Sequence, residues 1–136
     1  MTTLNEPDNF KDDWYGWLTN QCGHMVLGQV LFVALSCAAF FAIGEFPYRN
    51  TVWIAIAAGY LFWEFVIQRG YKWDSIEDSI FVCLYGAGIP SMAFHEVIPG
   101  SLIFTGDLQN IIPIVGLFCF HATVGVFVRV YAKEDE

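Results

Sequence analysis

The chain has 136 residues, of which 56% are hydrophobic and only 15% are charged, and its mean hydropathy is +0.48. Water-soluble domains usually carry about 25% charged residues, so the composition indicates that the lipid bilayer surrounds much of this protein. The net charge of −8 and the scattered six Lys and Arg residues exclude a nucleic-acid partner, because nucleic-acid-binding proteins present basic patches. The length allows one domain, residues 1–136, which we expect to be transmembrane.

The segment before the first long apolar run predicts a short amphipathic helix. An apolar stripe at i, i+4, i+7 and i+8 is formed by Phe10, Trp14, Trp17 and Leu18. Asn9 precedes the stripe, and Asn is a favoured N-cap residue. Because Trp side chains prefer the headgroup level, we expect this helix to lie along the inner leaflet of the membrane.

Four apolar stretches approach the length of about 20 residues that a helix needs to cross the hydrocarbon core. They predict spans at residues 25–44, 51–68, 76–94 and 111–131. The third is the least regular, since its apolar part is interrupted by Gly86, Gly88 and Pro90, and a re-entrant segment is the alternative there. The expected fold is therefore an all-α membrane protein, a bundle of about four transmembrane helices with an N-terminal interfacial helix.

The distribution of Lys and Arg predicts how these spans are oriented. With four spans, one side of the membrane carries both termini and holds Lys11, Arg69, Lys72, Arg129 and Lys133. The opposite side holds only Arg49. Cytoplasmic loops carry an excess of Lys and Arg, so we expect a multi-pass protein of the cell inner membrane with its N- and C-termini in the cytoplasm.

Ionisable residues near membrane depth are costly and tend to have a function. Several lie at those span ends that face the predicted cytoplasmic side, and they form a predicted polar cluster of His24, Glu64, Gln68, Arg69, Asp74, Asp78 and Arg129. Such a cluster could bind a polar headgroup, relay a proton or hold a cation. Its members also have structural explanations, such as a capping box of Asp74 with Glu77, snorkelling of Glu64 and anchoring by Arg129.

The sequence carries no motif of a common enzyme class. It has no HExxH zinc pair, no GxSxG elbow and no GxxxxGK[ST] phosphate loop, and its four cysteines form no CxxC pair. We therefore expect no cofactor and no metal site, and we favour a binding, transport or pore-forming role over an enzyme.

The stretch WEFVIQRGYKWDSIEDSIFVCLYGAG, residues 63–88, resembles the most recognisable part of VanZ-like small polytopic membrane proteins. These proteins have an acid and a glutamine four apart near a helix end, a short loop with Arg, an Asp-rich start and a glycine-containing helix. The matching positions are Glu64, Gln68, Arg69, Asp78 and Gly86, and His24 matches a His at the start of an earlier span. The usual Asn between the Asp and the Gly is missing, since Phe81 and Val82 occupy that region. The resemblance implies a membrane protein that is associated in some members with glycopeptide resistance and has no settled reaction.

A different class is the alternative. Phage-type holins are also short multi-span proteins with charged tails, and they oligomerise to open the inner membrane. Small residues suit helix association between copies and would allow a homo-oligomer: Gly28, Ala38, Ala39, Gly86 and Gly88. The same residues also suit ordinary packing inside a monomer.

Overall fold

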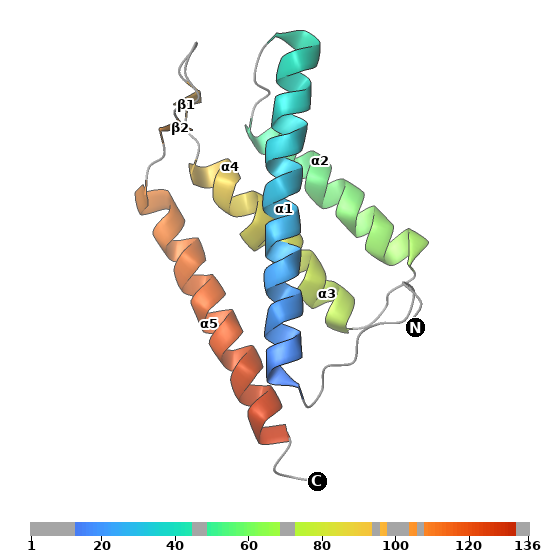
Figure 1. The fold of residues 1–136 in the computed structure, drawn as a ribbon, viewed down its shortest axis with the longest axis vertical. Helices are drawn as coiled ribbons and strands as arrows, with labels where there is room; N and C mark the ends of the chain where they lie inside the picture. Colours follow the sequence, from blue (N-terminus) through green and yellow to red (C-terminus); the bar gives the residue numbers. More distant parts are fainter. Residues whose placement is uncertain are drawn as a thin grey trace.

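The computed structural model describes residues 13–44, 49–68, 73–93, 96–97, 104–105 and 108–132. These residues are almost entirely helical (Figure 1). In chain order the elements are α1 (Trp14–Ile43), α2 (Arg49–Phe62), the π-helical η1 (Trp63–Ile67), α3 (Trp73–Ser79), the π-helical η2 (Ile80–Gly88), α4 (Ile89–Ala93) and α5 (Leu108–Ala132). Two strands of two residues each, β1 (Glu96–Val97) and β2 (Phe104–Thr105), pair antiparallel between α4 and α5, with Glu96 opposite Thr105.

Three helical segments are long and apolar enough to cross a membrane, as in a multi-pass membrane protein: Trp14–Ile43, Asn50–Ile67 and Ile111–Tyr131. They confirm the first, second and fourth predicted spans as apolar helices of membrane-crossing length. The third predicted span is helical from Trp73 to Ala93 but is not one of the three. It begins with acidic residues and is divided into α3, η2 and α4.

The N-terminal part of the chain differs from the expectation of a separate interfacial helix. α1 is one continuous helix of 30 residues, and the Asp13 carboxylate caps its start by accepting a hydrogen bond from the Gly16 N–H at 2.9 Å. No proline interrupts α1, and the glycines in its first half, Gly16, Gly23 and Gly28, are tolerated within a helix. The helix therefore runs from the predicted interfacial segment straight into the first span, whereas Asn9 and Phe10 lie outside the described residues.

The η2 segment lies at the centre of the fold, with α1, α2 and α5 packed around it (Figure 1). Phe81, Val82 and Ala87 have no exposed surface. Val82 and Ala87 pack with Phe32, Val52 and Ile56 from α1 and α2, whereas Phe81 packs with its η2 neighbour Tyr85 and with Trp17 and Ile114 from α1 and α5. The outer faces of the long helices remain apolar, as at Phe41, which is 84% exposed. Large apolar side chains turned outward are expected where lipid replaces water.

Two glycines allow α1 and η2 to touch backbone to backbone. A Cβ atom on Gly28 would collide with the Val82 carbonyl oxygen and would lie 2.8 Å from the Cα of Gly86. Real Cβ atoms do not approach other atoms so closely. Two of the small residues that would suit association between copies are therefore used for packing within one chain.

The two described ends of the chain lie at the same end of the molecule. α1 begins and α5 finishes at the lower end in Figure 1, and α3 begins between this end and the middle of the molecule. Near this end the Arg129 side chain of α5 packs over the Trp17 ring of α1. The start of α1 and the end of α5 therefore lie close together in the fold.

The π-helical backbone of η2 makes one hydrogen bond to α2 that a substitution can test. The indole Nε1 of Trp53 donates to the Cys83 carbonyl oxygen at 2.7 Å. We expect Trp53→Phe to lower the free energy of unfolding by about 1 kcal/mol, because the substitution removes this bond and retains most of the ring. Denaturant unfolding in detergent micelles measures the change.

Trp63→Phe is the control for that substitution, because Trp63 is 48% exposed. Substitutions at exposed positions usually change the free energy of unfolding by less than about 0.5 kcal/mol. An equal loss of stability in both variants would mean that the bond from Trp53 to Cys83 contributes nothing specific.

Candidate functional site

Two neighbouring acidic residues open the central helical segment. Glu77 and Asp78 lie in α3, and Glu77 is buried while Asp78 is half-buried. Successive residues of an α-helix point about 100° apart, so the two carboxylates reach different partners. Each is the centre of one branch of a polar network, which we define as Trp17, Gln21, His24, Tyr60, Glu64, Glu77, Asp78 and Arg129.

The Glu77 branch joins α3 to α1 and α5. The Glu77 Oε2 atom accepts a hydrogen bond from the Trp17 indole Nε1 at 3.0 Å and pairs with an Arg129 guanidinium nitrogen at 3.2 Å. The Arg129 and Glu77 side chains are only 14% and 8% exposed. The Arg129 guanidinium also lies 4.2 Å above the centre of the Trp17 ring, which is the geometry of a cation–π interaction.

A glycine makes room for this arrangement. A Cβ atom on Gly125 of α5 would collide with the Trp17 ring, so the absence of a side chain lets the indole lie against the helix. The Gly125 carbonyl oxygen accepts a second hydrogen bond from Arg129 at 3.2 Å. The guanidinium is thereby held between its own helix, the indole and the carboxylate.

The Asp78 branch joins α3 to α1 and α2. The Gln21 amide Nε2 donates to Asp78 Oδ1 at 2.9 Å, and the His24 Nε2 atom lies 3.4 Å from Asp78 Oδ2. The other imidazole nitrogen, Nδ1, is 3.2 Å from the Tyr60 hydroxyl. That hydroxyl also interacts with the Glu64 carboxylate, and Glu64 is only 4% exposed. A polar path thus runs from α3 through α1 to the end of α2.

The structure brings together some of the predicted site residues but not all of them. His24, Glu64, Asp78 and Arg129 all belong to the network. Gln68 is half-buried just after η1, where its backbone N–H donates to the Trp63 carbonyl at 2.9 Å, and no described contact joins its side chain to the network. Arg69 and the side chain of Asp74 lie outside the described residues.

The sequence analysis missed four network members: Trp17, Gln21, Tyr60 and Glu77. Trp17 was assigned to an interfacial stripe together with Leu18, whereas the structure buries it. The signal that could have identified it is the spacing of Trp17, Gln21 and His24 at i, i+4 and i+7, which is one face of a helix. Glu77 was considered only as a capping-box residue, yet its carboxylate reaches across to α1 and α5.

Both π-helical segments lie at this network. Glu64 is in η1, and η2 begins two residues after Asp78. A π-helix is rare, and π-helical turns occur frequently at functional sites. A π-helical turn is wider than an α-helical one and changes the angular position of the side chains that follow it. In this chain one such segment contains Glu64 and the other follows Asp78.

A deeper polar contact lies apart from the network. The Tyr85 hydroxyl of η2 is 3.3 Å from the His121 Nδ1 atom of α5. His121 also packs against the Phe81 ring, with ring centroids 5.1 Å apart. A hydrogen bond to a neighbouring helix is sufficient to explain a histidine within an apolar span.

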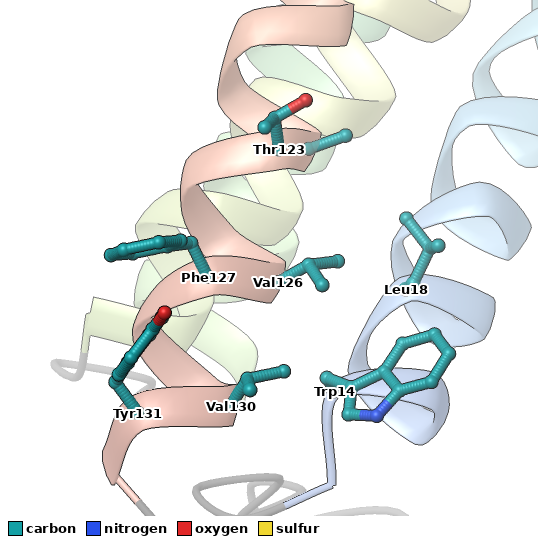
Figure 2. A pocket seen from close by; sticks show the side chains of 8 residues that line it. Trp14, Leu18, Thr123, Val126, Phe127, Val130 and Tyr131 are labelled. Carbon is teal, nitrogen blue, oxygen red and sulfur yellow. The ribbon is translucent and has the colours of Figure 1, made fainter.

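An apolar groove lies between α1 and α5 at the same end of the molecule as the network (Figure 2). Figure 2 shows Trp14 and Leu18 of α1 facing Val126 and Val130 of α5, with Phe127 and Tyr131 on the other flank of α5. The lining is almost entirely apolar apart from the Thr123 and Tyr131 hydroxyls and the Trp14 indole N–H. In a bilayer such a groove suits a lipid acyl chain.

The chemistry that the network allows is limited by its residues. Among the residues that the structure describes, no three His, Cys, Asp or Glu side chains are grouped so that they could hold a metal ion. The network instead combines carboxylates, a guanidinium, an imidazole, a phenol and an amide, which are hydrogen-bonding groups for a polar ligand. Comparison of the chain with protein-family models, with curated proteins and with solved structures gives no match.

Proposed function

We propose that this chain is a small inner-membrane protein whose polar network, near the cytoplasmic face, binds a polar lipid headgroup or an ion in a VanZ-like manner. The observation that carries the proposal is the pair of carboxylates at the start of one central helix, the buried Glu77 and the half-buried Asp78, each beside a cationic or ionisable partner from another helix. Replacing a buried ion pair by apolar residues is often neutral or stabilising. Its retention in a membrane protein is therefore a reason to infer a function.

The proposed topology treats the helical path from Trp73 to Ala93 as the third of four spans, in addition to the three long apolar helices. At about 1.5 Å per residue this path approaches the roughly 30 Å of the hydrocarbon core. The excess of Lys and Arg on the side of both termini supports a cytoplasmic position for the network. In this orientation the groove between α1 and α5 lies beside acyl chains of the inner leaflet.

The close contact of Gly28 with Gly86 inside one chain supports this proposal over the holin alternative. Glycines that pack within a monomer do not have to be explained by association between copies. On induced expression we expect normal growth and an intact membrane. An abrupt arrest of growth with release of cytosolic contents would contradict the proposal and favour a holin.

Asp78→Asn is expected to abolish stabilisation by the ligand. The purified protein in detergent is heated with individual lipids, namely phosphatidylethanolamine, phosphatidylglycerol or phosphatidylcholine, or with Na⁺, K⁺ or Mg²⁺. A ligand present at 100 times its Kd adds about 2.7 kcal/mol to the free energy of unfolding, so binding raises the melting temperature. At least one of these ligands should do so for the unsubstituted protein and not for Asp78→Asn.

Asp13→Asn is the matched control. It makes the same chemical change in an exposed helix cap outside the network, and Asn caps a helix about as well as Asp. This variant should respond to the ligand like the unsubstituted protein. The proposal fails if none of the lipids or ions stabilises the protein, or if Asp78→Asn responds in full.

A further inference from the structure

One buried hydrogen-bond acceptor of the network has no donor. Gln21 is 2% exposed, and its Nε2 atom donates to Asp78. Its Oε1 atom is buried and, among the described side chains, is the one such polar atom that lacks a hydrogen-bond partner. An unsatisfied buried acceptor costs roughly 1–3 kcal/mol, which a ligand with a hydrogen-bond donor would offset.

The direction of the Gln21 amide is determined by its neighbour. Turning the amide over would place Oε1 against the Asp78 carboxylate oxygen and would remove the 2.9 Å hydrogen bond. An ionised carboxylate only accepts hydrogen bonds. The Nε2 atom must therefore face Asp78, and Oε1 stays available to a donor from elsewhere.

The charges around this acceptor favour a cation. The described part of the network holds the three carboxylates of Glu64, Glu77 and Asp78, against one guanidinium and one imidazole. The guanidinium lies in the Glu77 branch, so Gln21 and His24 share the other branch with Asp78 and Glu64. Among the described side chains of this branch, an anionic headgroup would meet two carboxylates of like charge, whereas a cationic group would be attracted to them.

A shallow groove on the surface of α1 includes one member of this branch, His24. It is lined along α1 by Tyr15, Thr19, Asn20, Gly23 and His24, together with Gly16 and Leu27. The His24 side chain belongs to the groove and also contacts Asp78. A ligand that enters the branch from this groove would therefore have to displace the imidazole from Asp78.

We infer that the ligand of the network is a primary ammonium group, which donates an N–H to Gln21 Oε1 and carries its charge beside Asp78. This inference rests on the proposed function and specifies its ligand. An ammonium has three hydrogen-bond donors and no acceptor, which matches an unsatisfied acceptor among carboxylates. The same chemistry is offered by the headgroup of phosphatidylethanolamine and by a small free amine.

The test compares ligands that have the same charge but differ in N–H donors. The full-length protein is placed in nanodiscs of phosphatidylcholine with or without phosphatidylethanolamine, and in detergent with methylammonium or tetramethylammonium chloride. We expect phosphatidylethanolamine or methylammonium to raise the melting temperature by roughly 5 °C or more at concentrations well above Kd. Tetramethylammonium has no N–H and should have no such effect.

Gln21→Met tests the acceptor directly, because Met retains the length of the side chain and has no amide. The response to the ammonium ligand should be lost in this variant and retained in Gln29→Met, which makes the same change farther along α1 at a half-buried position. If Gln21→Met does not fold, the ligand comparison in the unsubstituted protein still decides the inference.

Each outcome separates the two proposals. A higher melting temperature with methylammonium alone supports the inference and identifies a free amine as the source of the ammonium group. A higher melting temperature with phosphatidylethanolamine identifies the lipid headgroup as that source. Equal effects of methylammonium and tetramethylammonium on the melting temperature would overturn the inference. A rise in melting temperature with phosphatidylglycerol alone, abolished by Asp78→Asn, would also overturn the inference but would leave the proposed function intact. If none of these lipids or amines, nor Na⁺, K⁺ or Mg²⁺, shifts the melting temperature, both proposals fail.

Discussion

Gly28→Ala is expected to lower the free energy of unfolding by about 3 kcal/mol, at the upper end of the usual cost of overpacking. The added methyl group would collide with the Val82 carbonyl oxygen and would lie 2.8 Å from the Gly86 Cα and 2.9 Å from the Ala87 nitrogen. All three are backbone atoms, so no side chain can rotate away. The collision can be removed only if α1 moves away from η2, and this movement would open the centre of the fold.

Gly23→Ala is the control, because Gly23 lies in the same helix and a Cβ atom there would meet nothing within 4 Å. Alanine is a better helix former than glycine, so this variant should gain roughly 0.5–1 kcal/mol. Reversible unfolding in micelles compares the two. A similar change in both variants would show that the approach of Gly28 to Gly86 does not limit the packing.

Glu77→Gln should lower the free energy of unfolding by about 3 kcal/mol, since removing one partner of a buried ion pair typically costs 3–5 kcal/mol of stability. The amide retains an oxygen that can accept the hydrogen bond from Trp17, so this substitution mainly removes charge. The Arg129 guanidinium then loses its carboxylate partner while its side chain remains only 14% exposed. Thermal and denaturant unfolding both measure the loss.

A double-mutant cycle separates this pair from its surroundings. Arg129→Met alone leaves Glu77 without the guanidinium. The loss in free energy of unfolding of the double variant, Glu77→Gln with Arg129→Met, should be smaller than the sum of the two single losses by roughly 0.5–3 kcal/mol. Thr123→Val provides the comparison, because Thr123 is exposed on α5 and its hydroxyl bonds within its own helix. The effects of Glu77→Gln and Thr123→Val should add, and additivity in the Arg129 cycle would contradict a direct interaction.

Much of the fold follows from the lengths of apolar runs and the positions of charges. Three long apolar helices were predictable, because a bilayer requires about 20 apolar residues per crossing; the orientation that the uneven distribution of Lys and Arg predicts remains a prediction. The continuity of α1 was less predictable. Aromatic residues at its start have the same pattern whether they lie in headgroups or pack inside, and only the contact of Trp17 with α3 and α5 distinguishes the two.

The candidate site was predictable in its position but only partly in its membership. Charged residues at span ends identified His24, Asp78 and Arg129, because charge is rare in such a chain. The uncharged members Gln21 and Tyr60 carry no comparable signal, and their roles depend on the relative rotation of packed helices. The two π-helical segments alter that rotation, and no sequence pattern that we used predicts them.

The central position of η2 has a consequence for the order in which the molecule can be assembled. α1 is synthesised before the acidic residues that its Trp17, Gln21 and His24 side chains contact, so its polar face enters the membrane without those partners. The guanidinium of Arg129 is made last and pairs with Glu77 only when α5 is in place. Completion of the fold therefore requires the final helix, and until α5 is in place Glu77 lacks its ion pair with Arg129.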